Sequence, residues 1–174
     1  MDRLWSPWRL AYVTRGDDAG DTGCVFCAAP GLPVTESLLV FAGDSCYVLL
    51  NLYPYNSGHL MVVPFRHVAT LAGLTSAEMD ELGRLTQRCE IALTEAYRPH
   101  GFNVGVNLGK PAGAGVLDHV HMHVVPRWNG DSNFMTVVGD TRVLPEALDA
   151  SAERLRPIFA RLAQSTEKNG TSTS

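Results

Sequence analysis

The chain has 174 residues, of which 45% are hydrophobic and 18% charged, and its formal net charge is −4 at pH 7. This is an ordinary globular composition, which excludes a wholly disordered chain, and the negative balance provides no overall basic field for a nucleic-acid backbone. No apolar run approaches the roughly 20 residues of a membrane span, and the N-terminus has no continuous apolar stretch of the signal-peptide type. We therefore expect a cytoplasmic protein with neither nucleic-acid nor membrane partners.

The N-terminal part of the chain predicts an arm followed by a pair of cysteines. Residues 1–23 combine the aromatic anchors Trp5 and Trp8 with a polar stretch, and we expect an arm that packs through the two tryptophans. Cys24 and Cys27 then form a C-x-x-C pair. In a reducing compartment this spacing indicates a metal site or a redox centre. A pair of buried thiols without metal is the alternative.

Three strands are predicted in the next third of the chain. Residues 36–42 and 45–51 are rich in apolar and β-branched residues, and the Gly-Asp pair between them is typical of a hairpin turn. A third strand is predicted at 59–63, where Pro64 ends it. His59, at its start, is assigned to closing the turn at Gly58.

A long helix and a further strand follow. Thr75 and Glu78 have the spacing of a capping box, and the apolar residues behind them recur at helical intervals, which predicts a helix that ends near Pro99. Residues 102–108 alternate between apolar and polar side chains, as a strand does. Cys46 in the second strand and Cys89 in the helix are expected to be core residues.

The remaining segments complete an α+β fold. A strand is predicted at 119–125, ended by Pro126. Residues 145–164 have a helical composition in which Pro157 is expected to kink or split the helix, and the tail from Ser165 is polar. The sequence therefore predicts an antiparallel sheet of about five strands with one long helix and a C-terminal helix. We assign a catalytic domain to 24–140 and a C-terminal helix and tail to 141–174.

The strand at 119–125 carries the most informative motif, because His119, His121 and His123 alternate with apolar residues. On a strand the three imidazoles share one face at intervals of ~6.6 Å, whereas on a helix His121 would point away from the other two. The outer two lie ~13 Å apart and cannot ligate one metal together. Imidazole has an unperturbed pKa of ~6.5, so a neutral ring nitrogen is available at pH 7.

A glycine-rich loop precedes this strand. The glycines at 109, 113 and 115 let backbone amides approach an anion closely. Alone, the loop is equally consistent with an ordinary connection between strands. Directly before three histidines it favours a phosphate site.

These motifs together resemble the histidine-triad family of nucleotide hydrolases and transferases. The resemblance rests on the His-apolar-His-apolar-His pattern, on Asn51-x-x-Pro54-x-x-x-Gly58-His59, and on the Asn-Val-Gly-x-Asn segment that ends at Asn107, and it covers about residues 24–126. The segments around the first tryptophans and after Pro126 are similar to the branch that includes diadenosine tetraphosphate phosphorylases.

The resemblance implies a role for each motif residue. His121 corresponds to the nucleophile that forms a nucleotidyl-histidine intermediate, and His123 to the histidine that contacts phosphate oxygens and assists the leaving group. It also implies a homodimer in which two sheets join. The implied nucleotide-binding residues are Asn51 at the ribose and Asn107, Gly113, Gly115 and His123 at the phosphates.

One segment departs from the family pattern. Many family hydrolases carry Gln-Ser just before the histidine strand, whereas residues 115–118 here read Gly-Val-Leu-Asp. The group that donates to the leaving phosphate is therefore not specified, and neither is the choice between hydrolysis and phosphorolysis.

The resemblance also implies a structural zinc site. The metal-containing branch of the family adds two histidines to the cysteine pair, and both are present here, so the expected ligands are Cys24, Cys27, His67 and His119. Four protein ligands leave no open position for a catalytic water. We therefore expect structural zinc and no catalytic cofactor.

The expected activity is nucleotidyl transfer or hydrolysis at the α-phosphorus of a nucleotide substrate, with diadenosine tetraphosphate as the leading candidate. Two alternatives remain open. One is a metal-dependent phosphoester hydrolase that uses strand histidines such as His121 and His123 as ligands. The other is a nucleotide-binding adaptor without turnover.

Overall fold

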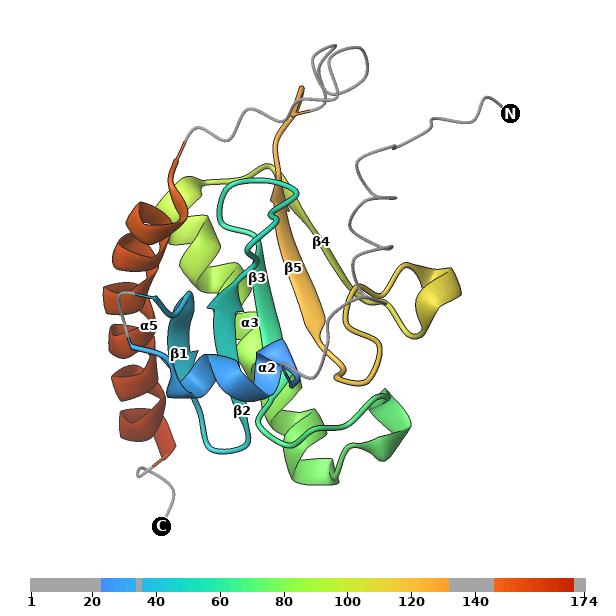
Figure 1. The fold of residues 1–174 in the computed structure, drawn as a ribbon. Coiled ribbons are helices and arrows are strands. Elements are labelled where there is room, and N and C mark those ends of the chain that lie inside the picture. Colours follow the sequence, from blue (N-terminus) through green and yellow to red (C-terminus); the bar gives the residue numbers. More distant parts are fainter. Residues whose placement is uncertain (1–22, 34–35, 132–145, 171–174) are drawn as a thin grey trace.

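The fold is an antiparallel sheet of five strands packed against two helices. The computed structural model describes residues 23–33, 36–131 and 146–170. The strands follow the order β1-β2-β3-β5-β4 (Figure 1), which confirms the predicted α+β class. Their bounds are Leu39–Ala42 for β1, Cys46–Leu50 for β2, Leu60–Pro64 for β3, Gly101–Val106 for β4 and Met122–Arg127 for β5. The predicted arm with Trp5 and Trp8 lies outside the described residues.

Helices connect and cover these strands. The α-helices are α2 (Val25–Ala28), α3 (Ser76–Tyr97) and α5 (Leu148–Gly170), and the short 3-10 turns are η2 (Ala29–Gly31), η3 (Leu71–Gly73) and η4 (Lys110–Ala112). Within the described ranges, no helix is long and apolar enough to cross a membrane.

The long helix α3 begins and ends where its sequence signals predict. The Thr75 hydroxyl accepts from the Glu78 amide at 3.3 Å, and the Glu78 carboxylate accepts from the Thr75 amide at 2.8 Å, so the capping box is formed. The helix ends at Tyr97, and Arg98 follows it in the left-handed conformation with φ of 48°. Pro99 disfavours a helical conformation for the residue before it, so the helix cannot continue.

Helix α3 also holds the hairpin turn between β1 and β2. The buried carboxylate of Glu81 accepts from the amides of Asp44 and Cys46, each at 2.9 Å, and from the amide of Ser45. A Cβ at Gly43 would lie 2.3 Å from Glu81 Oε1, so this turn leaves no room for a side chain there. The predicted hairpin is confirmed.

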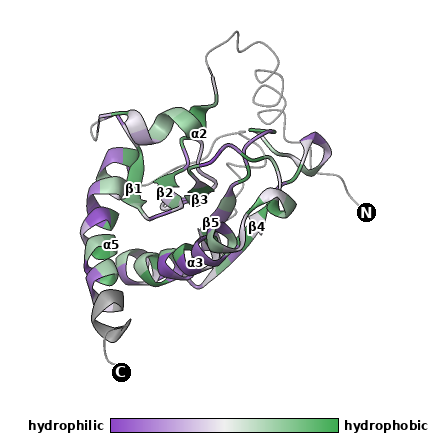
Figure 2. Ribbon diagram, turned by 90° about the horizontal axis from the view of Figure 1, so that it is seen from below, coloured by the Kyte–Doolittle hydropathy of each residue, from purple (hydrophilic) through white to green (hydrophobic). Residues whose placement is uncertain are grey.

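The two faces of the sheet have different partners, because successive strand residues point to opposite sides. Leu60 and Val62 of β3 face the larger apolar cluster, which α3 and α5 cover. Met61 and Val63 face a smaller cluster that includes Phe26 of α2. Figure 2 shows the strands between α3 on one side and α2 on the other.

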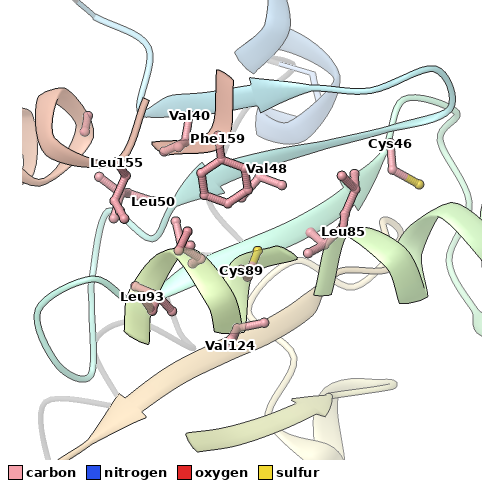
Figure 3. Packing of buried hydrophobic residues seen from close by; sticks show 14 of the residues in the cluster. Val40, Cys46, Val48, Leu50, Leu85, Cys89, Leu93, Val124, Leu155 and Phe159 are labelled. Carbon is pink, nitrogen blue, oxygen red and sulfur yellow. The ribbon is translucent and has the colours of Figure 1, made fainter. Parts of the chain in front are cut away.

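The larger cluster is the main core of the molecule (Figure 3). Cys46 and Cys89 are both fully buried within it, as predicted. Helix α5 contributes Leu155 and Phe159, both fully buried, so the C-terminal helix belongs to the same core as the sheet.

The predicted bounds of the histidine strand are wrong at both ends. Strand β5 begins at Met122, the last residue that pairs with β3; the amide of Val120 instead donates to the carbonyl of Val68 at 2.7 Å. Pro126 lies inside the strand. The carbonyl of Pro126 accepts from the Asn56 side chain at 3.0 Å. The partner on this side of the strand is therefore a side chain, and no neighbouring backbone there needs the N–H that proline lacks.

Helix α5 is one unsplit helix with Pro157 inside it, so of the two outcomes predicted for Pro157 a split is excluded. Proline leaves the carbonyl four residues earlier, that of Glu153, without its helical donor. Both residues are exposed, so water can bond to that carbonyl.

Candidate functional site

The three histidines of the motif share the sheet face opposite α3. His123 pairs with Met61 in the register of β3 and β5, and Met61 belongs to the smaller cluster on that face. The ring of Phe26 contacts both His119 and His121, with ring centroids 5.6 and 4.8 Å apart. The expectation of a common face is therefore confirmed, although only His123 lies within β5.

His121 is held with one ring nitrogen free. Its Nδ1 lies 2.9 Å from the carbonyl oxygen of His119. Because a carbonyl can only accept, Nδ1 carries the proton and the lone pair lies on Nε2. The side chain is 4% exposed, and this burial lowers the pKa of the ring. His121 is thus a neutral imidazole at pH 7 with an unprotonated Nε2, which is the form that acts as a nucleophile.

His123 is held in the opposite tautomer by a different partner. The amide of Tyr55 donates to Nδ1 of His59 at 3.1 Å, and Nε2 of His59 lies 3.0 Å from Nδ1 of His123. Because the amide can only donate, the proton of neutral His59 is on Nε2 and is donated to His123. The proton of His123 is then on its own Nε2. Burial, and to a smaller extent the adjacent His121, lowers the pKa of His123 to about 4.

The rings of His121 and His123 converge, with centroids 4.8 Å apart. One ring has a free lone pair on Nε2 and the other has a proton on Nε2. The pair therefore combines a nucleophile with a neutral hydrogen-bond donor, and neither ring adds a positive charge at pH 7.

Helix α2 places Phe26 against the candidate nucleophile. Phe26 is 6% exposed, and its carbonyl accepts from the hydroxyl of Tyr47 at 2.6 Å. Its ring shields His121 from water, which contributes to the burial that lowers the histidine pKa. This contact could not be predicted from the sequence, because Phe26 lies 95 positions before His121 in the chain.

The two asparagines predicted to bind nucleotide directly follow two strands of the sheet. Asn51 follows β2, and its Nδ2 is 3.4 Å from Nδ1 of His59; its side-chain oxygen accepts from the amide of Tyr53 at 2.9 Å. Asn107 follows β4, one residue beyond the last pair of the β4–β5 register, Val106 and Met122.

The glycine loop forms a 3-10 turn before β5. Gly109 and Gly113 have positive φ angles of 79° and 87°, which other residues rarely adopt. The amide of Gly113 donates to the carbonyl of Lys110 at 2.9 Å, so it already has an acceptor inside the loop. Gly115 is exposed. Of the two predicted amide donors to phosphate, Gly115 is the one that we retain as a candidate.

A second polar cluster, next to the first, brings together the four predicted metal ligands. Cys24, Cys27, His67 and His119 each offer one ligand atom, and these atoms all lie within 4.8 Å of one another. Sulfur and nitrogen atoms of the cluster lie 3.3 Å apart in two pairs and 3.6 Å apart in a third. Tetrahedral zinc with ordinary bond lengths separates a sulfur from a nitrogen ligand by about 3.6 Å. The donor set and its spacing therefore fit a four-coordinate metal.

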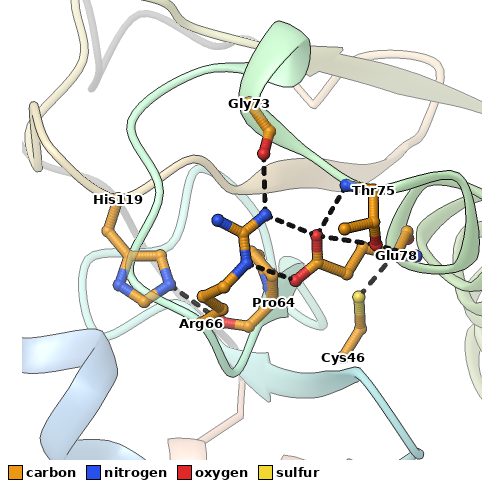
Figure 4. Close-up of polar contacts among 7 residues, drawn as sticks. All are labelled: Cys46, Pro64, Arg66, Gly73, Thr75, Glu78 and His119. Atoms are coloured by element: carbon orange, nitrogen blue, oxygen red, sulfur yellow. Dashed lines mark hydrogen bonds and ion pairs between the residues drawn. The ribbon is translucent and has the colours of Figure 1, made fainter.

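The orientation of His119 agrees with this fit. Its Nε2 lies 2.8 Å from the carbonyl of Pro64 (Figure 4), so Nε2 carries the proton and Nδ1 is unprotonated. Nδ1 is the atom that approaches both cysteine sulfurs. A carbonyl that holds the far nitrogen of a histidine ligand is the usual second contact in metal sites.

The loop that carries His67 is tied to the start of α3. Arg66 donates to both carboxylate oxygens of Glu78, at 2.9 and 2.7 Å, and to the carbonyl of Gly73 at 2.7 Å (Figure 4). The Arg66 contact, together with hydrogen bonds from Thr75, holds the pKa of Glu78 at about 2. The chain on either side of His67 is thus anchored.

Comparison with known proteins identifies the family of the chain. A family model for the HIT domain matches residues 33–130, which is more than half of the chain. The chain belongs to the HIT family.

Individual HIT proteins agree with this assignment. The chain is 42% identical over 167 residues to a Mycobacterium tuberculosis protein named AP-4-A phosphorylase, which covers 92% of this chain and 86% of the relative. It is 29% identical over 132 residues to a bis(5'-adenosyl)-triphosphatase of Dictyostelium discoideum, covering 72% and 88%. A Zn-bound histidine triad family protein from Mycobacterium smegmatis superposes with a TM-score of 0.66 at 29% identity, over 84% of this chain and 99% of that one.

Among the HIT motif residues, the sequence interpretation missed the part played by His59. It assigned His59 to the turn at Gly58, and that turn is present, with the His59 amide donating to the Asn56 carbonyl at 3.2 Å. The contact with His123 adds a second role. Strand parity could have indicated it, because His59 and Met61 alternate along one face and Met61 pairs with His123.

Proposed function

We propose that this HIT protein cleaves dinucleoside polyphosphates, with diadenosine tetraphosphate as the leading substrate, by transferring a nucleotidyl group to His121. The observation that carries the proposal is the hydrogen bond from His121 Nδ1 to the His119 carbonyl, which leaves Nε2 unprotonated. The names of the relatives at 42% and 29% identity supply the substrate class.

In the first step, Nε2 of His121 attacks the α-phosphorus. A bond forms between this nitrogen and phosphorus, and the bond from phosphorus to the bridging oxygen breaks, so that ATP leaves with that electron pair. The adenylated ring becomes a cation because Nδ1 keeps its proton. The His119 carbonyl, 2.9 Å from Nδ1, stabilises that positive charge as it develops.

His123 then serves as the donor beside the reacting phosphate. Its Nε2 proton is available to a phosphoryl oxygen or to the bridging oxygen of the leaving group. This role compensates for the missing Gln-Ser segment, because His123 requires no contribution from residues 115–118.

In the second step, an acceptor attacks the adenylyl group and restores neutral His121. Inorganic phosphate gives ADP, and water gives AMP. We favour phosphate, on the strength of the relative named AP-4-A phosphorylase. Splitting one displacement into two lowers each barrier.

We further propose that zinc occupies the cluster of Cys24, Cys27, His67 and His119. Two thiolates and two imidazoles are a preferred donor set for zinc, and a Zn-bound relative has the same fold. The metal would supply a cross-link between α2, the loop before α3 and the histidine segment. The chemistry at phosphorus stays with His121 and His123.

The alternative of a metal-dependent hydrolase receives less support. It requires Nε2 of both His121 and His123 as ligands, but the contacts with Tyr55 and His59 place a proton on Nε2 of His123. Within the described part of the chain, the ligand cluster found is the one around His119.

The test is product analysis combined with trapping of the intermediate. Incubation with diadenosine tetraphosphate and phosphate should give ADP and ATP, and protein quenched during turnover should gain the mass of one adenylyl group on the peptide that contains His121. AMP and ATP formed without phosphate would identify a hydrolase. AMP binding without any cleavage would identify the adaptor.

A His121→Ala variant should lose turnover and the adduct but keep its metal content and AMP binding. His100→Ala is a matched control, because His100 is an exposed histidine that accepts from the amide of Asn129 and lies outside the site; it should be as active as the wild type. Full activity of the His121 variant would refute the proposal.

A further inference from the structure

The end of β5 carries a polar cluster whose centre is the carboxylate of Asp131. Arg127 donates to it through two nitrogens, Nε to Oδ2 at 2.5 Å and Nη2 to Oδ1 at 2.8 Å. The amide of Trp128 lies 3.3 Å from Oδ2. The loop after β2 also reaches this carboxylate, because Nδ2 of Asn56 donates to Oδ2 at 2.8 Å.

Asn56 makes hydrogen bonds through both its side chain and its backbone. Its Nδ2 donates to Asp131 and to the carbonyl of Pro126, and both of these partners can only accept, which fixes the orientation of the amide. Its own backbone carbonyl accepts from the amide of His59 at 3.2 Å. Asn56 therefore ties the backbone of His59 to the end of β5.

Tyr55, the residue before Asn56, determines which ring nitrogen of His123 carries the proton. The amide of Tyr55 donates to Nδ1 of His59, and Nε2 of His59 meets Nδ1 of His123. The Tyr55 ring also lies over His59, with centroids 4.9 Å apart. A shift of this short loop would move the amide from Nδ1 of His59, and the tautomer would then depend on the longer contact of 3.4 Å from Asn51 Nδ2 to the same nitrogen.

We propose that Asp131 is a positioning residue for nucleotidyl transfer: through Asn56 it holds the Tyr55 amide against His59 and so keeps the proton of His123 on Nε2. The catalytic consequence rests on the proposed function, whereas the tautomer is a property of the folded protein. A purely structural role for Asp131, closing the turn after β5 with Arg127, would leave that tautomer unchanged.

The chain contains a matched control in Glu146. Its carboxylate accepts from Nε and Nη2 of Arg154, from the hydroxyl of Tyr97 and from that of Ser151. The Glu146 side chain is 16% exposed and that of Asp131 is 12% exposed. Both are paired carboxylates with arginine partners, but the partners of Glu146 are on α3 and α5 and include neither Asn56 nor Tyr55.

The experiment measures the ring nitrogens of His59 and His123 by NMR in 15N-histidine-labelled protein, for Asp131→Ala, Asn56→Ala and Glu146→Gln. Wild type and Glu146→Gln should show one tautomer, with an unprotonated Nδ1 and a protonated Nε2 on both rings. Asp131→Ala and Asn56→Ala should show a mixture at His59 and His123. Their kcat should fall by up to about a hundredfold, as misplacement of a catalytic group does, with a smaller change in KM.

If Asp131→Ala fails to fold, Asn56→Ala provides the test of the positioning role, because the Asn56 variant leaves the ion pair of Asp131 and Arg127 intact. Wild-type tautomers in a folded Asn56→Ala variant would overturn the proposal, and so would the same mixture in Glu146→Gln. If the wild-type protein does not cleave dinucleoside polyphosphates, the proposed function fails, but the tautomer comparison still tests the role of Asp131.

Discussion

Acidification should destabilise the wild-type protein more than a His123→Gln variant. Burial and the adjacent His121 lower the pKa of His123 from 6.5 to about 4 in the folded protein. As the pH falls through 6.5, the unfolded chain takes up a proton that the folded protein does not accept until about pH 4. Stability is therefore lost with falling pH across this window, and the loss is complete below about pH 4.

The size of the effect follows from the two pKa values. Between pH 8 and pH 5 the ratio of unfolded to folded protein rises about thirtyfold from this group alone, which corresponds to about 2 kcal/mol. Glutamine does not titrate, and its oxygen can still accept from Nε2 of His59. The lowered pKa values of His119 and His121 affect both proteins and cancel in the difference.

The assay is urea unfolding of both proteins, with equal metal content, at several pH values from 8 to 5. The free energy of unfolding of the wild type should fall by about 2 kcal/mol more than that of the variant. Parallel curves for the two proteins would show that His123 is not held neutral by burial, and the assignment of a neutral donor would fail.

Three further substitutions test the structure around the site. Gly58→Ala should lower the free energy of unfolding by about 2–3 kcal/mol, seen as a drop in Tm of roughly 5–10 °C. The reason is that φ at this residue is +76° and a Cβ would lie 2.9 Å from side-chain carbons of Leu93 and Tyr97. Gly83→Ala, in α3 with nothing within 4 Å, should instead stabilise the protein by about 0.5–1 kcal/mol, and a loss of stability there equal to that at Gly58 would contradict the argument. Cys27→Ser should reduce bound zinc well below one equivalent by atomic absorption, since a hydroxyl replaces a thiolate ligand; undiminished zinc would remove Cys27 from the ligand set.

Features that depend on neighbours in the sequence could be predicted well. The capping box of Thr75 and Glu78 and the hairpin turn at Gly43 depend on residues a few positions apart, and each formed as expected. The alternation of the triad histidines indicated their common face for the same reason, since parity along an extended segment is a local property.

Features that depend on which segments meet in space could not be derived in this way. His59 and His123 are 64 positions apart, and their hydrogen bond exists only because β3 pairs with β5 in one register. The strand bounds at Met122 and Pro126 were mispredicted for a related reason, because they depend on where the partner strand and the Asn56 side chain lie. The metal ligands came from the family pattern, and spacing alone would have given only the cysteine pair.

The C-terminal helix protects the border of the sheet at β1. At β1, the guanidinium group of Arg156 in α5 donates to the outward carbonyls of Ser37 and Leu39, each at 3.0 Å, and these are the acceptors that an incoming strand would need. At β4, the outermost strand on the other side, Val104 is 51% exposed. A strand added at β1, by contrast, would have to displace the hydrogen bonds of Arg156, which disfavours pairing with another chain at this border. The C-terminal helix therefore protects this border of the sheet as well as completing its core.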